Sequence, residues 1–183
     1  MTTIIIIAVI VLVIIGAVIM AYNNLAKKRI ECDEAFAAMD VYMKQRYDMI
    51  PNLVETVKGY AKHEKETFTA VINARNKFQE AKTPEEEMKA SGEMTKALNK
   101  MMLLVEAYPE LKANENFLQL QGDLKDCEEK IAYSRQFYND SVLSYMNKIE
   151  MFPSNIIASM FGFKEMKYFE VEETEKKAPT VKF

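Results

Sequence analysis

Apolar residues recur every seven positions between residues 36 and 81, the spacing of a long helix that packs one face against other helices. The first apolar seam comprises Phe36, Met43, Ile50, Val57, Glu64, Val71 and Phe78. The companion seam lies three residues further on and comprises Met39, Arg46, Leu53, Tyr60, Thr67, Ala74 and Ala81. Polar side chains interrupt the two seams at Arg46, Glu64 and Thr67. The pattern predicts one long amphipathic helix.

Two further helices follow from the same periodicity. In the segment from about residue 112 to residue 152, the repeat comprises Phe117, Leu124, Ile131, Tyr138, Tyr145 and Phe152, with Leu120 and Cys127 on the companion seam. In the segment before it, Thr83 is a candidate N-cap, Pro84 suits the first helical position and Pro109 ends the helix. No stretch alternates apolar and polar residues for long, so strands are expected to be few or absent.

Pro51 stands inside the first predicted helix. A proline removes one backbone donor and crowds the carbonyl four residues earlier, so it kinks or breaks a helix. The heptad register passes through Pro51 unshifted and no glycine lies next to it, which favours a kink. The alternative is a tight reversal at residues 48–52, which would give four antiparallel helices of similar length. Either interpretation predicts an all-α fold, an antiparallel bundle of three to four long helices.

The pattern changes after Pro153. A short helix is expected from Ser154, as its cap, to Phe161, where Gly162 stops it. Residues 164–183 are charged and lack helical periodicity, so they are expected to form an irregular tail.

The N-terminal residues form an apolar run of about 19 residues without charge, from Ile4 to Tyr22, long enough to cross about 30 Å of hydrocarbon as a helix. A cleaved secretory signal is the alternative, but residues 1–3 supply no positive region and no suitable cleavage site precedes Tyr22. Three basic residues at 27–29 follow the run, and such residues favour the cytoplasmic side. The sequence predicts a transmembrane helix at 4–22 in contact with membrane lipid, a short external N-terminus, and a cytoplasmic bundle over residues 23–163.

Overall charge and cysteine content add little to this picture. The 24 Lys and Arg residues are interleaved with 27 Asp and Glu residues, and no basic face suggests a nucleic-acid partner. The two cysteines, Cys32 and Cys127, have no metal-ligand spacing and fall on apolar helical seams. We expect them to be buried free thiols in a reducing cytoplasm.

Residues that could perform catalysis are scarce in the sequence. His63 is the one histidine, so a zinc-protease helix or a His-based metal site cannot form within one chain, and a serine or cysteine nucleophile has no other histidine as its base. A di-iron bundle needs Glu-x-x-His on two helices, and none is present. The five glycines form no phosphate-binding loop. We expect a non-enzymatic protein without metal or cofactor.

Several blocks of sequence carry a family resemblance. They read "YNNLAKKRIECDEAF", "MDVYMKQRYDMIPNLVETVKGYAKHE", "EAYPELKANENFLQLQ", "YNDSV", "FPSNIIASMFGF" and "YFE". On these blocks the chain resembles the LemA family of bacterial membrane proteins, although Phe36 stands where such proteins typically carry tryptophan. The resemblance implies one N-terminal span, a short external N-terminus, an antiparallel helical bundle inside the cell and no established enzymatic activity. A magnetosome-membrane protein of some bacteria is also similar to this family, which favours a role in membrane organisation.

Three groups of residues are candidates for contacts. If the first helix runs to residue 81, the returning helix is too short to cover the membrane-proximal part of its seam, and a second copy of the chain is expected to cover Phe36, Met39, Met43 and Ile50. A polar group around Pro51 either satisfies the local backbone or binds a partner; it comprises Arg46, Asp48, Asn52 and Glu55. Four aromatic residues of the C-terminal part are expected to pack back onto the bundle: Phe161, Phe163, Tyr168 and Phe169.

These observations support two hypotheses of function. In the first, the chain is a membrane-anchored scaffold or assembly protein that self-associates and binds other proteins, not identifiable from the sequence, at the cytoplasmic face of the membrane. In the second, it is an accessory or sensor subunit that binds a membrane enzyme system such as a quality-control protease. The recovery of one enzyme partner in a fixed ratio would distinguish the second from the first.

Overall fold

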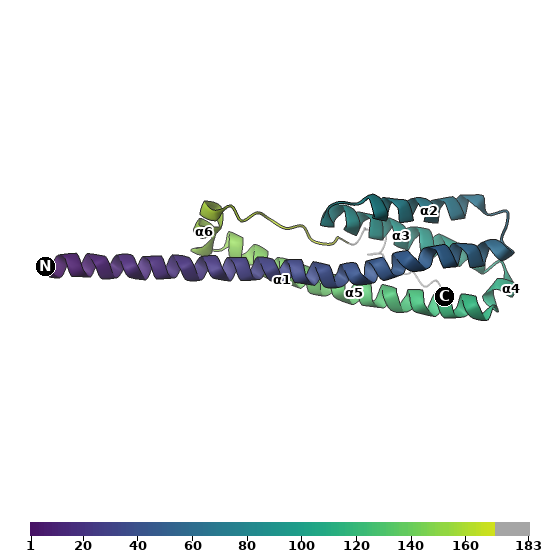
Figure 1. Ribbon diagram of the computed structural model, residues 1–183, viewed down its shortest axis with the longest axis horizontal. Coiled ribbons are helices and arrows are strands. Elements are labelled where there is room, and N and C mark those ends of the chain that lie inside the picture. Colours follow the sequence, from purple (N-terminus) through teal and green to yellow (C-terminus); the bar gives the residue numbers. More distant parts are fainter. Residues whose placement is uncertain (171–183) are drawn as a thin grey trace, which may run out of the picture. The chain divides into compact units, whose positions relative to one another are not determined.

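The structure is a computed structural model that describes residues 1–170, and the predictions for the rest of the tail lie outside this range. The described residues form helices and connecting segments without a strand, so the predicted all-α class is confirmed (Figure 1). The helices are α1 (Thr2–Tyr60), α2 (Lys65–Glu80), α3 (Pro84–Val105), α4 (Pro109–Lys112), α5 (Glu115–Glu150) and α6 (Ser154–Phe161).

The chain divides into two compact units. Within the described residues, unit 1 comprises residues 1–37 and 136–168, and unit 2 comprises residues 38–135 and 169–170. Helices α1 and α5 contribute residues to both units.

Helix α1 continues through Pro51, whose ring is exposed, so the chain does not reverse at residues 48–52. A bend of the helix axis at Pro51 stays a prediction. The expected single helix from residue 36 to residue 81 is wrong, because α1 ends at Tyr60 and α2 begins at Lys65. Glu64 has a non-helical backbone, with φ −91° and ψ 47°, and its N–H donates to the Ala61 carbonyl in a turn at 3.3 Å.

The start of α3 agrees with the sequence. Thr83 is its N-cap and Pro84 its first residue, as predicted. The Thr83 hydroxyl accepts from the Glu86 N–H at 3.2 Å, and the Glu86 carboxylate accepts from the Lys82 N–H at 2.8 Å. The two bonds satisfy backbone donors that a helix start leaves open.

The core of unit 2 brings the apolar seams of α1, α2, α3 and α5 together. Its largest members are fully buried or nearly so, and they include Ile50, Leu53, Val57, Phe68, Val71, Met94, Leu98, Met101, Leu111, Phe117 and Leu124. Tyr47 of α1 adds an aromatic contact with Phe78 of α2, at 5.6 Å between ring centroids, and Arg75 lies 4.4 Å from the centre of the Tyr47 ring.

Unit 1 has its own buried residues, drawn from α1, α5 and α6. They are Leu25, Cys32, Ala35, Tyr138, Val142, Tyr145 and Ala158. Two tyrosine hydroxyls of α5 fasten the segment after α6 by donating to its carbonyls: Tyr145 to Lys164 at 2.8 Å and Tyr138 to Lys167 at 2.9 Å.

Helix α6 begins and ends where the sequence predicts, at Ser154 and Phe161, but its N-cap differs from the prediction. Its N-cap is Pro153, and the Ser154 hydroxyl donates to the Met151 carbonyl at 2.9 Å, so the prediction of Ser154 as the cap is wrong. Gly162 terminates the helix with φ +71°, a left-handed conformation that glycine adopts without steric cost. The next N–H, of Phe163, donates to the Ala158 carbonyl at 3.0 Å.

Candidate functional site

The N-terminal part of α1 is apolar on its whole circumference. An 18-residue window of this helix has a mean hydropathy of 3.5, and none of it is buried within the chain. The large apolar side chains from Ile4 to Ile15 are 47% to 72% exposed. A helix that is hydrophobic all round is normally buried in a large core or in a membrane, so this segment has the length and composition of a membrane span.

A buried arginine is the centre of the polar site in unit 2. Arg46 of α1 is 2% exposed, and its guanidinium donates to the Thr95 hydroxyl at 2.9 Å, the Ser91 hydroxyl at 2.7 Å and the Ser91 carbonyl at 3.1 Å. It also pairs with the Glu128 carboxylate of α5. Thr95 in turn donates within the group, with the Ser91 carbonyl and the Glu128 carboxylate both 3.2 Å from its hydroxyl. The site ties α1, α3 and α5 together through one cation.

The other polar residues predicted around Pro51 do not join Arg46. Asp48, Asn52 and Glu55 are exposed. Glu55 forms a surface ion pair with Lys58 at 2.9 Å, and the Thr56 hydroxyl donates to the Asn52 carbonyl at 2.8 Å. The predicted cluster is therefore divided between a buried arginine and an exposed helix face.

The seam proposed for self-association has cover within the chain. Met39 and Ile50 are 0% exposed and Met43 is 1% exposed, while Phe36 is half-buried with its ring 5.8 Å from that of Tyr138. The expectation that nothing in the same chain covers these residues is wrong, because it assumed a first helix that runs to residue 81. Self-association itself stays a prediction.

Two carboxyl groups meet between α1 and α3 in unit 2. Burial, followed by the charge and hydrogen bond of Asp40, raises the pKa of Glu87 above its ordinary value. Lys44 pairs with Asp40 at 2.7 Å from the solvent side. One oxygen of each carboxyl, Asp40 Oδ1 and Glu87 Oε2, is buried, and neither accepts a hydrogen bond from any group outside the carboxyl pair. Burial and the neighbouring carboxyl both favour the protonated form of Glu87.

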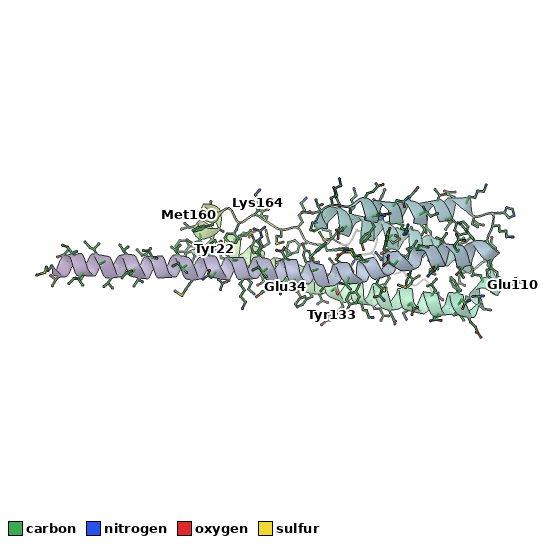
Figure 2. The ribbon with its side chains drawn as sticks, in the orientation of Figure 1. Tyr22, Glu34, Glu110, Tyr133, Met160 and Lys164 are labelled. Carbon is green, nitrogen blue, oxygen red and sulfur yellow. The ribbon has the colours of Figure 1, made fainter. Side chains whose placement is uncertain are left out.

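The predicted aromatic residues of the C-terminal part lie in different places. Phe161 and Phe163 contact Tyr22 of α1 edge-on, with ring centroids 4.9 Å and 5.6 Å apart. Tyr168 is 39% exposed, whereas Phe169 is buried in unit 2 with the Arg135 guanidinium 5.5 Å from the ring centre. Figure 2 shows Met160 of α6 next to the part of α1 that carries Tyr22, with Glu34 further along α1.

Both cysteines are free thiols that are buried. Desolvation raises the pKa of Cys32 to about 11, and it also raises the pKa of Cys127. A thiol of this kind carries little thiolate at neutral pH and is a poor nucleophile.

Small-molecule and metal sites receive little support from the described residues. A shallow groove of about 220 Å³ lies between α2 and α3, smaller than typical ligand pockets of about 300 to 1,000 Å³. Within residues 1–170, no three His, Cys, Asp or Glu side chains are grouped so that they could hold a metal ion.

Sequence reasoning missed three residues of the arginine site. Ser91, Thr95 and Glu128 were not predicted as partners of Arg46. The signal was present, because a serine and a threonine on one apolar seam, opposite an arginine on another, need polar partners when buried.

The fold and these sites define a class of protein: a helical protein with an apolar N-terminal segment of membrane-spanning length and a helical bundle that contains a buried arginine paired with a glutamate. The sequence profile of the LemA family matches residues 35–183, and the chain belongs to the LemA family. The predicted family is confirmed.

Relatives with assigned names lie at low identity. The chain is 24% identical to magnetosome protein MamQ 2 of Paramagnetospirillum magneticum, over 85% of this chain and 67% of the relative. It is 25% identical to magnetosome protein MamQ of Magnetospirillum gryphiswaldense, over 85% of this chain and 66% of the relative. Protein LemA of Metamycoplasma hominis is 26% identical, over 84% of this chain and 71% of the relative. The chain therefore spans about two thirds of the length of the magnetosome relatives.

Proposed function

We propose that this protein is a membrane-anchored, non-catalytic scaffold that displays its helical bundle at the cytoplasmic face of the membrane. The observation that carries the proposal is the N-terminal part of α1, where the large apolar side chains are about half exposed or more on every side. Exposure of such an apolar surface to water is unfavourable, whereas its contact with lipid is favourable. The basic residues at 27–29, just after the apolar run, support a cytoplasmic location for the residues that follow.

The bundle suits a protein that binds others. Within residues 1–170, polar interior side chains hold α1, α3 and α5 together through Arg46, and the groove between α2 and α3 is smaller than a typical ligand pocket. Relatives named as magnetosome proteins support a role in organising a membrane compartment. Self-association is part of the proposal, but Met39 and Met43 are core residues, so other side chains must make that contact.

Protease protection tests the topology. In inverted membrane vesicles, added protease should digest the bundle, whereas in right-side-out vesicles it should leave the bundle intact. Digestion in right-side-out vesicles would refute the proposed orientation.

Crosslinking in intact membranes, followed by purification of the full chain, tests the scaffold role. Copies of the chain crosslinked to each other and to several proteins would support a scaffold. One enzyme complex recovered in a fixed ratio would contradict it and favour an accessory subunit.

A further inference from the structure

The segment from Met151 to Phe163 exposes an unusual amount of apolar surface. None of its 13 residues is charged. Five of its large side chains are at least half exposed: Phe152 (79%), Met160 (71%), Met151 (59%), Phe161 (51%) and Ile156 (50%). An apolar patch of this kind on a folded surface marks an interaction site.

The segment is held at a defined place on α1. The rings of Phe161 and Phe163 pack edge-on against Tyr22, and Ala158 of α6 is 2% exposed. Tyr22 is the last residue of the apolar run, and tyrosine is enriched at the boundary between hydrocarbon and headgroups. If residues 4–22 span the bilayer, these contacts place α6 at the level of that boundary.

One side of α6 carries exposed apolar side chains. Ile156 and Met160 are four residues apart and therefore lie on the same side of the helix, while Ala158 is buried on another. Phe152 precedes the helix and is the most exposed of the five apolar side chains. Charged residues of both signs, Lys148 and Glu150 before the segment and Lys164 and Glu165 after it, are exposed and flank it.

We propose that residues 151–163 are a second membrane-contact element, which inserts its apolar side into the cytoplasmic leaflet beside the span. The occupant of the patch is phospholipid, at the border between headgroups and acyl chains, and the contact is mainly apolar because the flanking charges nearly balance. Lipid is favoured over a second protein because the patch adjoins the span. Tyr22 is the last residue of the span, and its ring contacts Phe161 and Phe163 of the segment. A helix with an exposed apolar side can lie in this plane with that side in the boundary between headgroups and acyl chains.

The inference rests on the proposed span. One fluorescence experiment can test the span and the second membrane contact separately. The sequence has no tryptophan, so each introduced tryptophan is the sole one in its variant. The variants Phe152→Trp and Met160→Trp probe the patch, and Leu12→Trp probes the span. Tyr133→Trp, at a position 77% exposed on α5, is the aqueous control. Each full-length variant is placed singly in nanodiscs whose lipids carry bromine near the headgroup end or near the methyl end of the acyl chain.

Bromine near the headgroup end should quench most of the fluorescence of Phe152→Trp and Met160→Trp, and bromine near the methyl end should quench less. Leu12→Trp should respond in the opposite order, and Tyr133→Trp should be unaffected. If Leu12→Trp is quenched while both patch variants match the aqueous control, the span stands and the second contact is refuted. Blue-shifted but unquenched emission from the patch variants would mean that protein covers the patch, which also refutes the proposal. Unquenched Leu12→Trp would refute the span itself.

Discussion

Removal of Glu128 should destabilise the bundle more than removal of Arg46. In Glu128→Ala, a guanidinium that is 2% exposed loses its counter-ion, and breaking a buried ion pair from one side typically costs about 3 to 5 kcal/mol. The Glu128 side chain is 34% exposed, so water can enter the space it leaves, and we expect the lower end of this range, about 3 kcal/mol. For a chain of this length that corresponds to a melting temperature lower by about 6 to 12 °C.

Arg46→Met leaves no buried charge without a partner. The Glu128 carboxylate can turn to water, and the Thr95 hydroxyl can still donate to the Ser91 carbonyl, now 3.2 Å away. The variant then loses a few hydrogen bonds and packs imperfectly, which should lower the free energy of unfolding by about 1 to 2 kcal/mol. In the double variant no charge is stranded, so its stability should be close to that of Arg46→Met alone. Non-additivity of about 3 kcal/mol follows, since the two residues share one network.

Thermal unfolding of the full chain in nanodiscs, followed by helical circular dichroism, measures all three variants under one condition. Glu55→Ala is the matched control, because Glu55 also pairs with a basic residue but at the surface, where such pairs are worth about 1 kcal/mol or less. The reasoning is refuted if Arg46→Met is the more destabilising single substitution, or if the two substitutions add.

Three further predictions use the same measurement. The folded pKa of Glu87 is raised, so its stabilising neutral form is present at pH below 4.5 and is lost as the pH rises through the folded value. Glu87→Gln should therefore raise the melting temperature at neutral pH and change it little in acid, and an equal gain at both would contradict this origin. Gly162→Ala should lower the free energy of unfolding by about 1 kcal/mol, because φ of Gly162 is +71°. Gly92→Ala is the control, since Gly92 lies inside α3 with nothing within 4 Å of an added Cβ, and it should stabilise by up to about 1 kcal/mol. Equal effects of the two substitutions would argue against backbone strain at Gly162. Tyr145→Phe removes the bond to the Lys164 carbonyl and should cost about 1 kcal/mol, and an unchanged melting temperature would show that the bond adds nothing.

The helical class and most helix positions could be predicted from the sequence because periodicity and caps are local signals. Thr83 and Pro84 marked the start of α3, and Gly162 marked the end of α6. The break between α1 and α2 was missed because the apolar seams resume after it in the same seven-residue register, with Val57 and Val71 both buried. Glu64, the acidic residue on that seam, was the local sign of the break.

Pro51 does not reverse the chain, so the alternative of a tight turn at residues 48–52 is wrong. A proline removes one helical hydrogen bond, a loss that a long helix packed on its neighbours can bear, and Pro51 is exposed. The reversal instead needs several residues that leave the helical conformation, and these are found at 61–64.

The candidate sites were predictable only in part. Arg46 stood out because a cation on an apolar seam must be paired, but the identity of its partners depends on which helices adjoin α1. Periodicity along one chain does not supply that information. The same limit explains why Met39 and Met43 were assigned to a second copy.

The two buried cysteines give the protein a pair of built-in reporters of local opening. Cys32 belongs to unit 1 and Cys127 to unit 2, and neither thiol is more than 1% exposed. With a pKa of about 11, only about one Cys32 in ten thousand is thiolate at pH 7 even before access is considered. Alkylation by a maleimide therefore requires the surrounding helices to separate, and its rate at each site measures how often they do. Mass spectrometry of the two cysteine peptides would follow the breathing of each unit independently, in native membranes and without any engineered label.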